Sequence, residues 1–168
     1  MNELDEAWSH MLAGAIANAK ATGRDDVADY LALKQSNDLI RQTSVEWLFS
    51  SLIEIATDPT GGNSSLVIER ESPHEFALRG AKMAGSLIRL RHGVRCLTVE
   101  AGWTRTPSHG FMRGGALAAA RIGHFGLPEM GVELVLMRVD ETPVWSSPDG
   151  RSFDSQSLRE HFAILLGK

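Results

Sequence analysis

The side chains best suited to chemistry lie in one glycine-rich stretch, from Ala101 to Gly115 (AGWTRTPSHGFMRGG). It carries Arg105, His109 and Arg113 in a run interrupted by proline and glycine residues. Guanidinium groups match the geometry of phosphates and carboxylates, and glycines let backbone N–H groups approach a bound anion. Loops of this composition, held on a rigid sheet, often contain the functional residues of a domain. The stretch therefore predicts an anion-binding loop.

Neighbouring residues extend this candidate site. Arg89 and Arg91 belong to a strand predicted shortly before the loop, on its polar face, and Trp103 and Phe111 can stack on a planar ligand. In the alternative interpretation, both aromatic rings pack under the loop as a small core, and the arginines pair with acidic helices. The predicted ligand-binding residues are Arg89, Arg91, Trp103, Arg105, His109 and Arg113.

Positive charge is concentrated in the middle of the chain. Residues 79–121 contain eight Lys/Arg and one acid, Glu100, whereas residues 1–60 contain ten Asp/Glu and four Lys/Arg. Such segregation predicts either ion pairs within the protein or a surface that binds anions. The isoelectric point near 5.8 and the lack of sustained basic stripes argue against nucleic acid. The predicted partner is an anionic small molecule or an acidic protein.

Other chemistries have weaker support. Cys96 lies on a predicted strand, where a lone cysteine usually packs rather than acts as a nucleophile with His92 or His109. His74, His92, His109 and His124 are 18, 17 and 15 residues apart, so only the fold can bring them together on a metal ion. The chain has no phosphate loop, nucleophile elbow, zinc-protease motif or paired-cysteine pattern. We therefore predict neither a metal nor a cofactor.

Composition places the chain among globular proteins. Its 168 residues are 43% hydrophobic and 23% charged, which suits one domain with a sizeable core. The single cysteine excludes an internal disulfide, and no run is apolar and long enough to span a membrane. The first residues, MNELDEAW, are acidic, whereas a targeting segment would be basic. We expect a cytoplasmic protein without a membrane partner.

Helical periodicity dominates the first third of the chain. Apolar residues from Leu4 to Ala19 recur at helical spacing and predict a helix over residues 3–22. A second, long helix is predicted over residues 25–57, ending before Asp58-Pro59. The short connection makes the two helices an antiparallel hairpin. We expect one domain, 1–168, made of a helical hairpin at about 3–57, a loop at 58–65 and an α+β part at 66–168.

The clearest β-structure is a hairpin from Ser86 to Gly102. If His92 and Gly93 are the central turn residues, Arg91 faces Val94 and every other cross-strand pair follows. Alternation then assigns side chains to two faces of the hairpin. The apolar face consists of Ile88, Leu90, Leu97 and Val99; the polar face consists of Arg89, Arg91, Cys96, Thr98 and Glu100.

The remaining segments complete an α+β fold. Short strands are predicted at residues 66–68 and 76–78, a longer strand at 132–139, and a small hairpin joining 144–145 to 152–153. Residues 116–122 have helical propensity, but flanking glycines leave a strand open as well. Ser157 and Glu160 fit a capping box for a short C-terminal helix that ends at Gly167. The predicted fold is an N-terminal helical hairpin packed on a mostly antiparallel sheet of about five strands, closed by this helix.

Three functions are compatible with these features. The leading hypothesis is a non-enzymatic binding or interaction module that recognises an anionic small molecule or partner through Arg105, His109 and Arg113. The second is a hydrolase or transferase acting on a phosphorylated or carboxylated substrate, with His109 as general acid or base. The third is a structural homo-oligomer that associates through its helical hairpin, with Trp47 and Phe49 among the buried residues.

Overall fold

The computed structural model describes residues 3–61 and 65–168, and the chain divides into two compact units, Met1–Thr43 and Ser44–Lys168. We call them the helical unit and the sheet unit. The boundary falls inside a long helix, α2, so the loop predicted at residues 58–65 lies within the sheet unit. Three residues of that predicted loop, 62–64, lie outside the described part of the chain.

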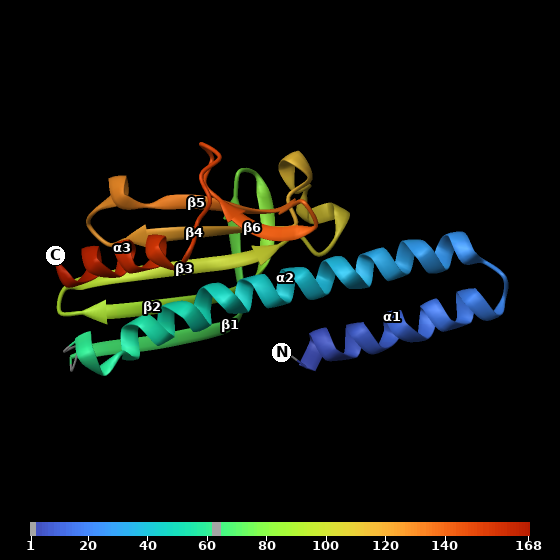
Figure 1. Ribbon diagram of the computed structural model, residues 1–168, viewed down its shortest axis with the longest axis horizontal. Helices are drawn as coiled ribbons and strands as arrows, with labels where there is room; N and C mark the ends of the chain where they lie inside the picture. The colour runs from blue at the N-terminus through green and yellow to red at the C-terminus, as the bar shows by residue number, and fades with distance from the viewer. Residues whose placement is uncertain (1–2, 62–64) are drawn as a thin grey trace. The chain divides into compact units, whose positions relative to one another are not determined.

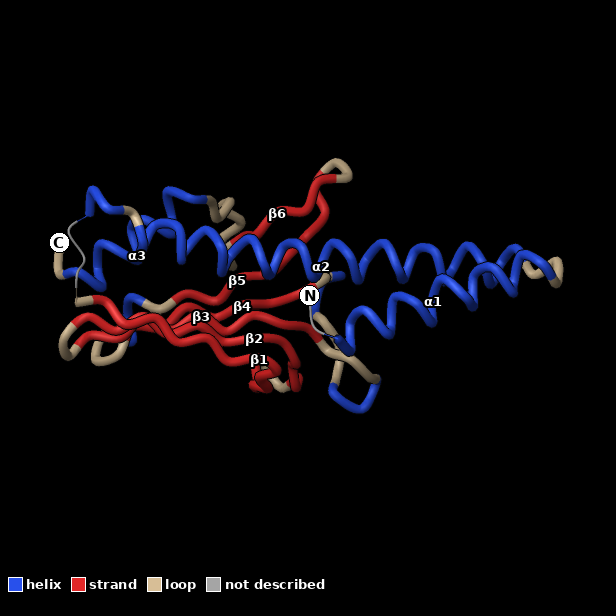
Figure 2. Tube along the Cα trace, turned by 90° about the horizontal axis from the view of Figure 1, so that it is seen from below, coloured by secondary structure: helices blue, strands red, loops and turns tan. Residues whose placement is uncertain are grey.

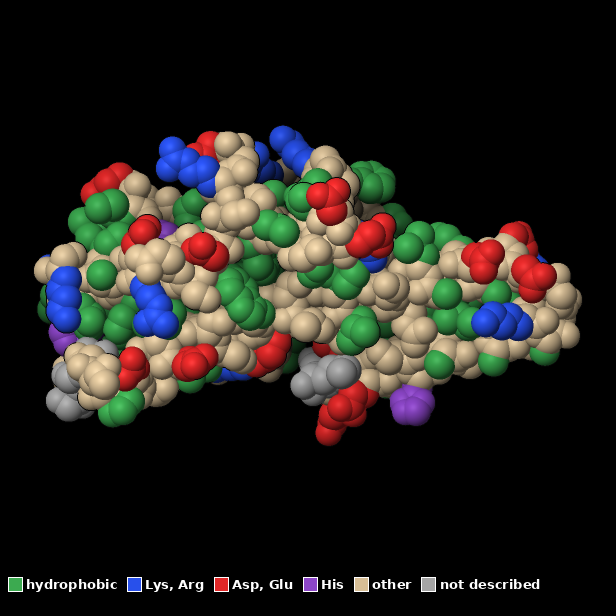
Figure 3. Space-filling view, in the orientation of Figure 1, with side chains coloured by type: hydrophobic (Ala, Val, Ile, Leu, Met, Phe, Trp, Pro, Cys, Tyr) green, Lys and Arg blue, Asp and Glu red, His purple; other side chains and the backbone are tan. Residues whose placement is uncertain are grey.

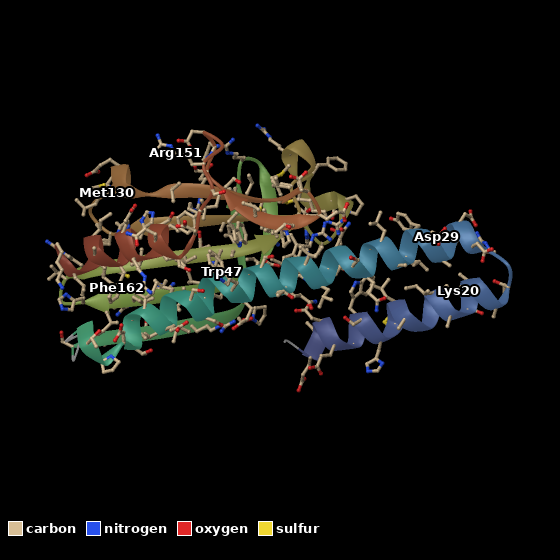
Figure 4. All side chains as sticks on the ribbon, viewed as in Figure 1. Lys20, Asp29, Trp47, Met130, Arg151 and Phe162 are labelled. Carbon is tan, nitrogen blue, oxygen red and sulfur yellow. The ribbon has the colours of Figure 1, made fainter. Side chains whose placement is uncertain are left out.

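The helical unit is an antiparallel hairpin of two helices, α1 (Glu3–Ala21) and the first part of α2 (Asp25–Thr57) (Figure 1). Gly23 adopts a left-handed conformation, with φ of 73°, and ends α1 as predicted. Lys20 and Asp29 lie on either side of this connection (Figure 4). The predicted bounds of both helices are confirmed to within one residue.

The sheet unit is built on an antiparallel meander. Within residues 65–168, six strands lie side by side in chain order (Figures 1 and 2). The α+β class is therefore as predicted, with six strands rather than about five. The strands are β1 (Leu66–Leu78), β2 (Ala81–His92), β3 (Arg95–Trp103), β4 (Ala118–His124), β5 (Val132–Val139) and β6 (Thr142–Ser146).

One face of the sheet is covered by helices, and we call it the helix face. Residues 44–57 of α2 and the C-terminal helix α3 (Ser155–Leu166) pack on it, and Trp145 Nε1 donates a hydrogen bond to the Ser44 carbonyl oxygen at 3.1 Å. The predicted apolar face of the hairpin forms the centre of this core. Its completely buried members include Leu48, Phe49, Leu52, Ile88, Leu90, Leu97, Leu134 and Leu136.

The predicted register of the β2–β3 hairpin was wrong, although its two faces were right. Arg91 pairs with Cys96 rather than Val94, because the turn is centred on Gly93 and Val94, with His92 opposite Arg95. Gly93 has φ of 60°, which places the glycine at the first central position, where a two-residue turn of this hand requires it. The correction moves each partner by two residues, so side chains keep the faces predicted for them.

Two further segments differ from the prediction. Residues 66–78 form one strand with a bulge between Glu71 and His74, instead of two short strands. Residues 116–122, for which helix and strand were both open, lie mostly in strand β4. The alanines of β4 are buried on both faces of the sheet, where their small side chains fit. This tertiary context overrides their helical propensity.

The cap of α3 is also shifted from the prediction. Asp154 is the N-cap, and its side chain accepts a hydrogen bond from the Ser157 backbone N–H at 3.0 Å. Ser157 occupies the third helical position and its Oγ accepts a hydrogen bond from the Asp154 backbone N–H, so Glu160 has no part in the capping box. The predicted C-terminal stop is confirmed, because Gly167 is left-handed with φ of 80°.

The other face of the sheet, which we call the open face, is partly covered by the ends of β1 and β2. These ends turn out of the sheet and pass behind β3, β4 and β5 (Figure 1). Arg79, in the turn after β1, reaches Glu133 on β5, with 2.7 Å between Nε and Oε2. The chain can bend here because Gly85 and Gly102 face each other across β2 and β3. A Cβ on Gly85 would lie 2.6 Å from the Gly102 Cα, so the strands approach more closely than side chains would allow.

Candidate ligand-binding site

The glycine-rich stretch forms a loop between β3 and β4, residues 104–117, which we call the β3–β4 loop. It contains two single turns of 3₁₀ helix, Pro107–His109 and Arg113–Gly115. Gly110 lies against the start of β2 with φ of 98°, and a Cβ there would be 3.3 Å from the Ala81 Cα. Glycine therefore lets the loop lie close to β2 and continue over the open face.

The loop packs on a second, smaller apolar cluster on the open face. Met112 is its anchor, whereas Phe111, predicted either to stack on a ligand or to pack under the loop, is 81% exposed. This cluster exists because the bent ends of β1 and β2 bring their side chains over β4. The buried residues under Met112 are Phe76, Leu78, Ala81, Met83 and Ala119.

A pocket of about 260 Å³ lies between the loop, the β1–β2 turn and β5. Its floor is part of the same apolar cluster, and the loop and β5 supply the rim. Such a concave apolar surface with a few polar groups at its edge is typical of small-molecule sites. The residues that argue for a site here are Met83, Ala119, Phe111, Arg113, Arg79 and Glu133.

The rim of the pocket has an uncompensated positive charge. Arg79 is paired with Glu133 at 2.7 Å. Arg113 is exposed, and its guanidinium makes no hydrogen bond or ion pair with any residue in the described ranges. One guanidinium therefore remains to attract an anion at the mouth of the pocket.

Arg105 and Trp103 lie outside the pocket lining. The Arg105 guanidinium carbon lies 3.8 Å from the centre of the Trp103 ring, and Nη2 donates a hydrogen bond to the Ala84 carbonyl oxygen at 3.2 Å. Trp103 is buried, which agrees with the alternative interpretation that its ring packs under the loop as part of a small core. These contacts fix the start of the loop against β2.

Arg89 and Arg91 also lie away from the pocket. They project from the open face toward β1, where Arg89 lies 3.8 Å from Glu71 and Arg91 lies 3.3 Å from Glu69. Internal ion pairing was one of the two interpretations of the basic middle segment, and these two arginines follow it. Their partners are acids of the adjacent strand β1, not the acidic helices that the sequence suggested.

His109 is held at the end of the first 3₁₀ turn and does not line the pocket. Its Nδ1 atom is buried and has no hydrogen-bond partner among the described residues. The nearby Lys82 ammonium holds the pKa of Glu75 below its usual value, and His109 adds a smaller effect in the same direction.

Two polar clusters were not predicted from the sequence. On the open face, Glu100 accepts a 2.6 Å hydrogen bond from Arg121 and lies 2.9 Å from His74 Nε2. On the helix face, His124 Nε2 lies 2.9 Å from His161 Nδ1. The cross-strand pair of Glu100 with Arg121 depends on the β3–β4 register, which the sequence does not show.

The four histidines considered as metal ligands do not converge. His74 and His124 occupy opposite faces of the sheet, and in residues 3–61 and 65–168 no three His, Cys, Asp or Glu side chains are arranged to hold a metal ion.

Comparisons with protein-family models, with curated proteins and with solved structures found no match to this chain. None of the helices within the described residues combines the length and the apolar character needed to cross a membrane.

Proposed function

We propose that this protein binds a small molecule with an apolar body and a single anionic group in the pocket beneath the β3–β4 loop. The observation that carries the proposal is the combination of an apolar floor with the unpaired Arg113 guanidinium at the rim. The predicted anion-binding function is kept, but its centre moves from Arg105 and His109 to Arg113 and the pocket.

The size and charge of the pocket restrict the ligand class. A volume of about 260 Å³ is at the small end of ligand pockets, so the ligand is much smaller than a nucleotide cofactor. Because Glu133 neutralises Arg79, the rim offers one positive charge and favours a monoanion. Medium-chain or aromatic monocarboxylates have this combination, with the carboxylate at Arg113 and the hydrocarbon on Met83 and Ala119.

We expect octanoate or 1-naphthoate to stabilise the protein against thermal unfolding. A ligand at a hundred times its dissociation constant adds about 2.7 kcal/mol, a shift of a few degrees for a chain of this size. Arg113→Ala should weaken binding about tenfold, because one charge-assisted contact at an exposed rim is lost. Isothermal titration calorimetry measures this change directly.

Three controls separate pocket binding from other effects. Octanol tests whether the negative charge is needed, and Arg113→Lys should retain part of the affinity because it keeps the charge. Ala119→Leu fills the floor and should abolish binding while leaving the unfolding transition cooperative. Binding that survives both Arg113→Ala and Ala119→Leu would show that the ligand lies elsewhere.

Self-association through the helical unit is a second candidate function. The unit buries few apolar side chains, notably Leu12, Ala19 and Ala28, and its interhelical contacts include a polar set in which Trp8 Nε1 and Arg41 both donate to Asp38. Many larger apolar residues are on its surface, and Figure 3 shows hydrophobic patches among the charged groups on its visible side. The exposed residues are Leu4, Trp8, Met11, Tyr30, Leu33 and Leu39.

A second copy of the same hairpin would cover these residues in a four-helix bundle. Two helices alone form a core too small for most independent domains, and two hairpins related by a two-fold axis are a common solution. Phe49, which was predicted to lie between subunits, is unavailable for this interface, because it is completely buried in the sheet unit.

We expect sedimentation velocity to show a dimer at micromolar concentration. The double variant Met11→Lys with Leu33→Lys should sediment as a monomer, because it places charges on the proposed interface. Gln156→Lys, which adds a positive charge at an exposed position of α3 in the sheet unit, is the control and should remain dimeric. A wild-type protein that stays monomeric at the highest soluble concentration contradicts this function.

The enzyme and acidic-partner hypotheses stay as predictions. His109 does not line the pocket, so the proposed ligand would not be within reach of it for proton transfer.

A further inference from the structure

Two histidines meet between the sheet and α3. His124, at the end of β4, is buried, and His161 projects from the middle of α3. His124 Nε2 and His161 Nδ1 are 2.9 Å apart, the two rings are nearly parallel at 16°, and the Phe153 ring lies 5.9 Å from His161. At this distance the facing nitrogens share one proton, which one ring donates and the other accepts.

Two charges cannot be accommodated in this arrangement. One added proton charges the pair but leaves the N–H···N hydrogen bond intact. A second places N–H groups on both facing nitrogens, so the hydrogen bond is lost and two positive charges repel at close range. The interaction therefore favours docking of α3 when the pair is neutral and opposes it when both rings are charged.

Within residues 3–61 and 65–168, no carboxylate makes an ion pair or a hydrogen bond with either imidazole of the pair. On the same face of the sheet, β2 and β3 contribute His92 and Arg95, and the Arg95 guanidinium donates to the Ile164 carbonyl oxygen of α3 at 3.3 Å. On α3 itself, Arg159 and Glu160 flank His161 and are exposed. Glu129, in the short 3₁₀ turn near β4, is also exposed.

We propose that the His124–His161 pair is an acid-sensitive latch that holds α3 on the sheet at neutral pH and loosens it when both imidazoles become protonated. Loosening exposes the apolar side of α3 together with the part of the helix face that it covers. The side chains so exposed include Leu158, Phe162 and Leu165, of which Phe162 is labelled in Figure 4.

The protonation behaviour of the pair sets the pH range. Burial lowers the pKa of His124, and burial followed by the charge of His124 lowers the pKa of His161 to about 4. When α3 is undocked, His161 regains its ordinary pKa near 6.5, so the undocked form binds more protons between these values. The contribution to docking is therefore complete above pH 6.5 and falls as the pH decreases toward 4.

The N-cap residue of α3, Asp154, does not change its protonation in the pH range in which the histidines titrate. Hydrogen bonds from Ser157 hold the pKa of Asp154 below its usual value of 3.8, so this carboxylate remains charged at pH 4.5. Loss of the cap therefore does not account for a change in α3 between pH 7 and 4.5.

Hydrogen exchange of the α3 amides tests the proposal. After correction for the intrinsic pH dependence of exchange, protection of α3 in the wild-type protein should fall about tenfold or more from pH 7 to 4.5. Strands β2 and β3 should keep their protection over the same range. In His161→Phe, which cannot titrate and can pack on Phe153, protection of α3 should be independent of pH in this range.

His92→Gln is the matched control, because it removes a histidine from the same sheet face and should keep the wild-type pH dependence. If His161→Phe does not fold, His161→Leu serves in its place, because it also removes the imidazole whose pKa is lowered by docking. Imidazole NMR on the wild-type protein should show His161 titrating well below 6.5. Equal protection of α3 at pH 7 and 4.5, or a loss that persists in both histidine variants, overturns the proposal.

Discussion

Phe49→Ala is expected to lower the free energy of unfolding of the sheet unit by about 3–5 kcal/mol, the usual range for removing a completely buried aromatic ring. Phe49 has no exposed surface, and the Arg70 guanidinium carbon lies 5.2 Å from its ring centre. The loss combines the transfer of the ring to water with the cavity left between α2 and the sheet. Urea unfolding followed by tryptophan fluorescence measures it, because Trp103 and Trp145 are buried in the same unit.

Phe125→Ala is the control for this prediction. Phe125 has the same ring and lies in the same unit but is 77% exposed, so we expect a change within about 0.5 kcal/mol. If Phe49→Ala left monomer stability unchanged and instead dissociated an oligomer, Phe49 would belong to a subunit interface, as the sequence had suggested.

Gly85→Ala is expected to cost about 3 kcal/mol or more and to alter the sheet, not merely a side-chain contact. The added Cβ would collide with the Ala101 carbonyl oxygen and the Gly102 Cα, which are backbone atoms and cannot rotate away. Relief requires β2 and β3 to separate where β2 begins to bend. Since that bend brings Leu78, Ala81 and Met83 to the pocket, a folded Gly85→Ala protein should also lose ligand binding.

Gly14→Ala provides the opposite expectation. Gly14 lies in the interior of α1, and a Cβ there meets nothing within 4 Å, so alanine should stabilise the helix by about 0.5–1 kcal/mol. Unfolding curves of the two variants give changes of opposite sign if the close strand approach at Gly85 is correct. A neutral Gly85→Ala would show that the sheet tolerates a flatter path and that the bend is not required for folding.

Local patterns in the sequence determined most of the secondary structure of this protein. Helical periodicity with a glycine stop determined α1, and the proline after Asp58 determined where α2 ends. Period-two alternation determined which side chains of β2 and β3 face the core, a result that survives the two-residue register error because it preserves the faces. These features depend on residues close together in the chain, where steric preference and hydrophobic periodicity suffice.

The candidate site was determined only in part. The sequence identified the β3–β4 loop and Arg113, but it also grouped Arg105, Arg89 and Arg91 with them. Arg105 contacts Trp103 and the Ala84 carbonyl oxygen, and Arg89 and Arg91 pair with acids of β1. Ala84 and these acids lie near the arginines only because β1, β2 and β3 pair in a particular register. The separation of residues along the chain does not reveal which residues pair across the strands.

The pocket and the histidine latch were decided by tertiary structure alone. The pocket floor joins β1, β2 and β4 because the chain bends at Gly85 and Gly102, whose mutual contact cannot be inferred from two isolated glycines. His124 and His161 are 37 residues apart and meet because α3 returns to the helix face. Local propensity determines which elements form, whereas burial of their apolar faces against one another determines which polar groups meet.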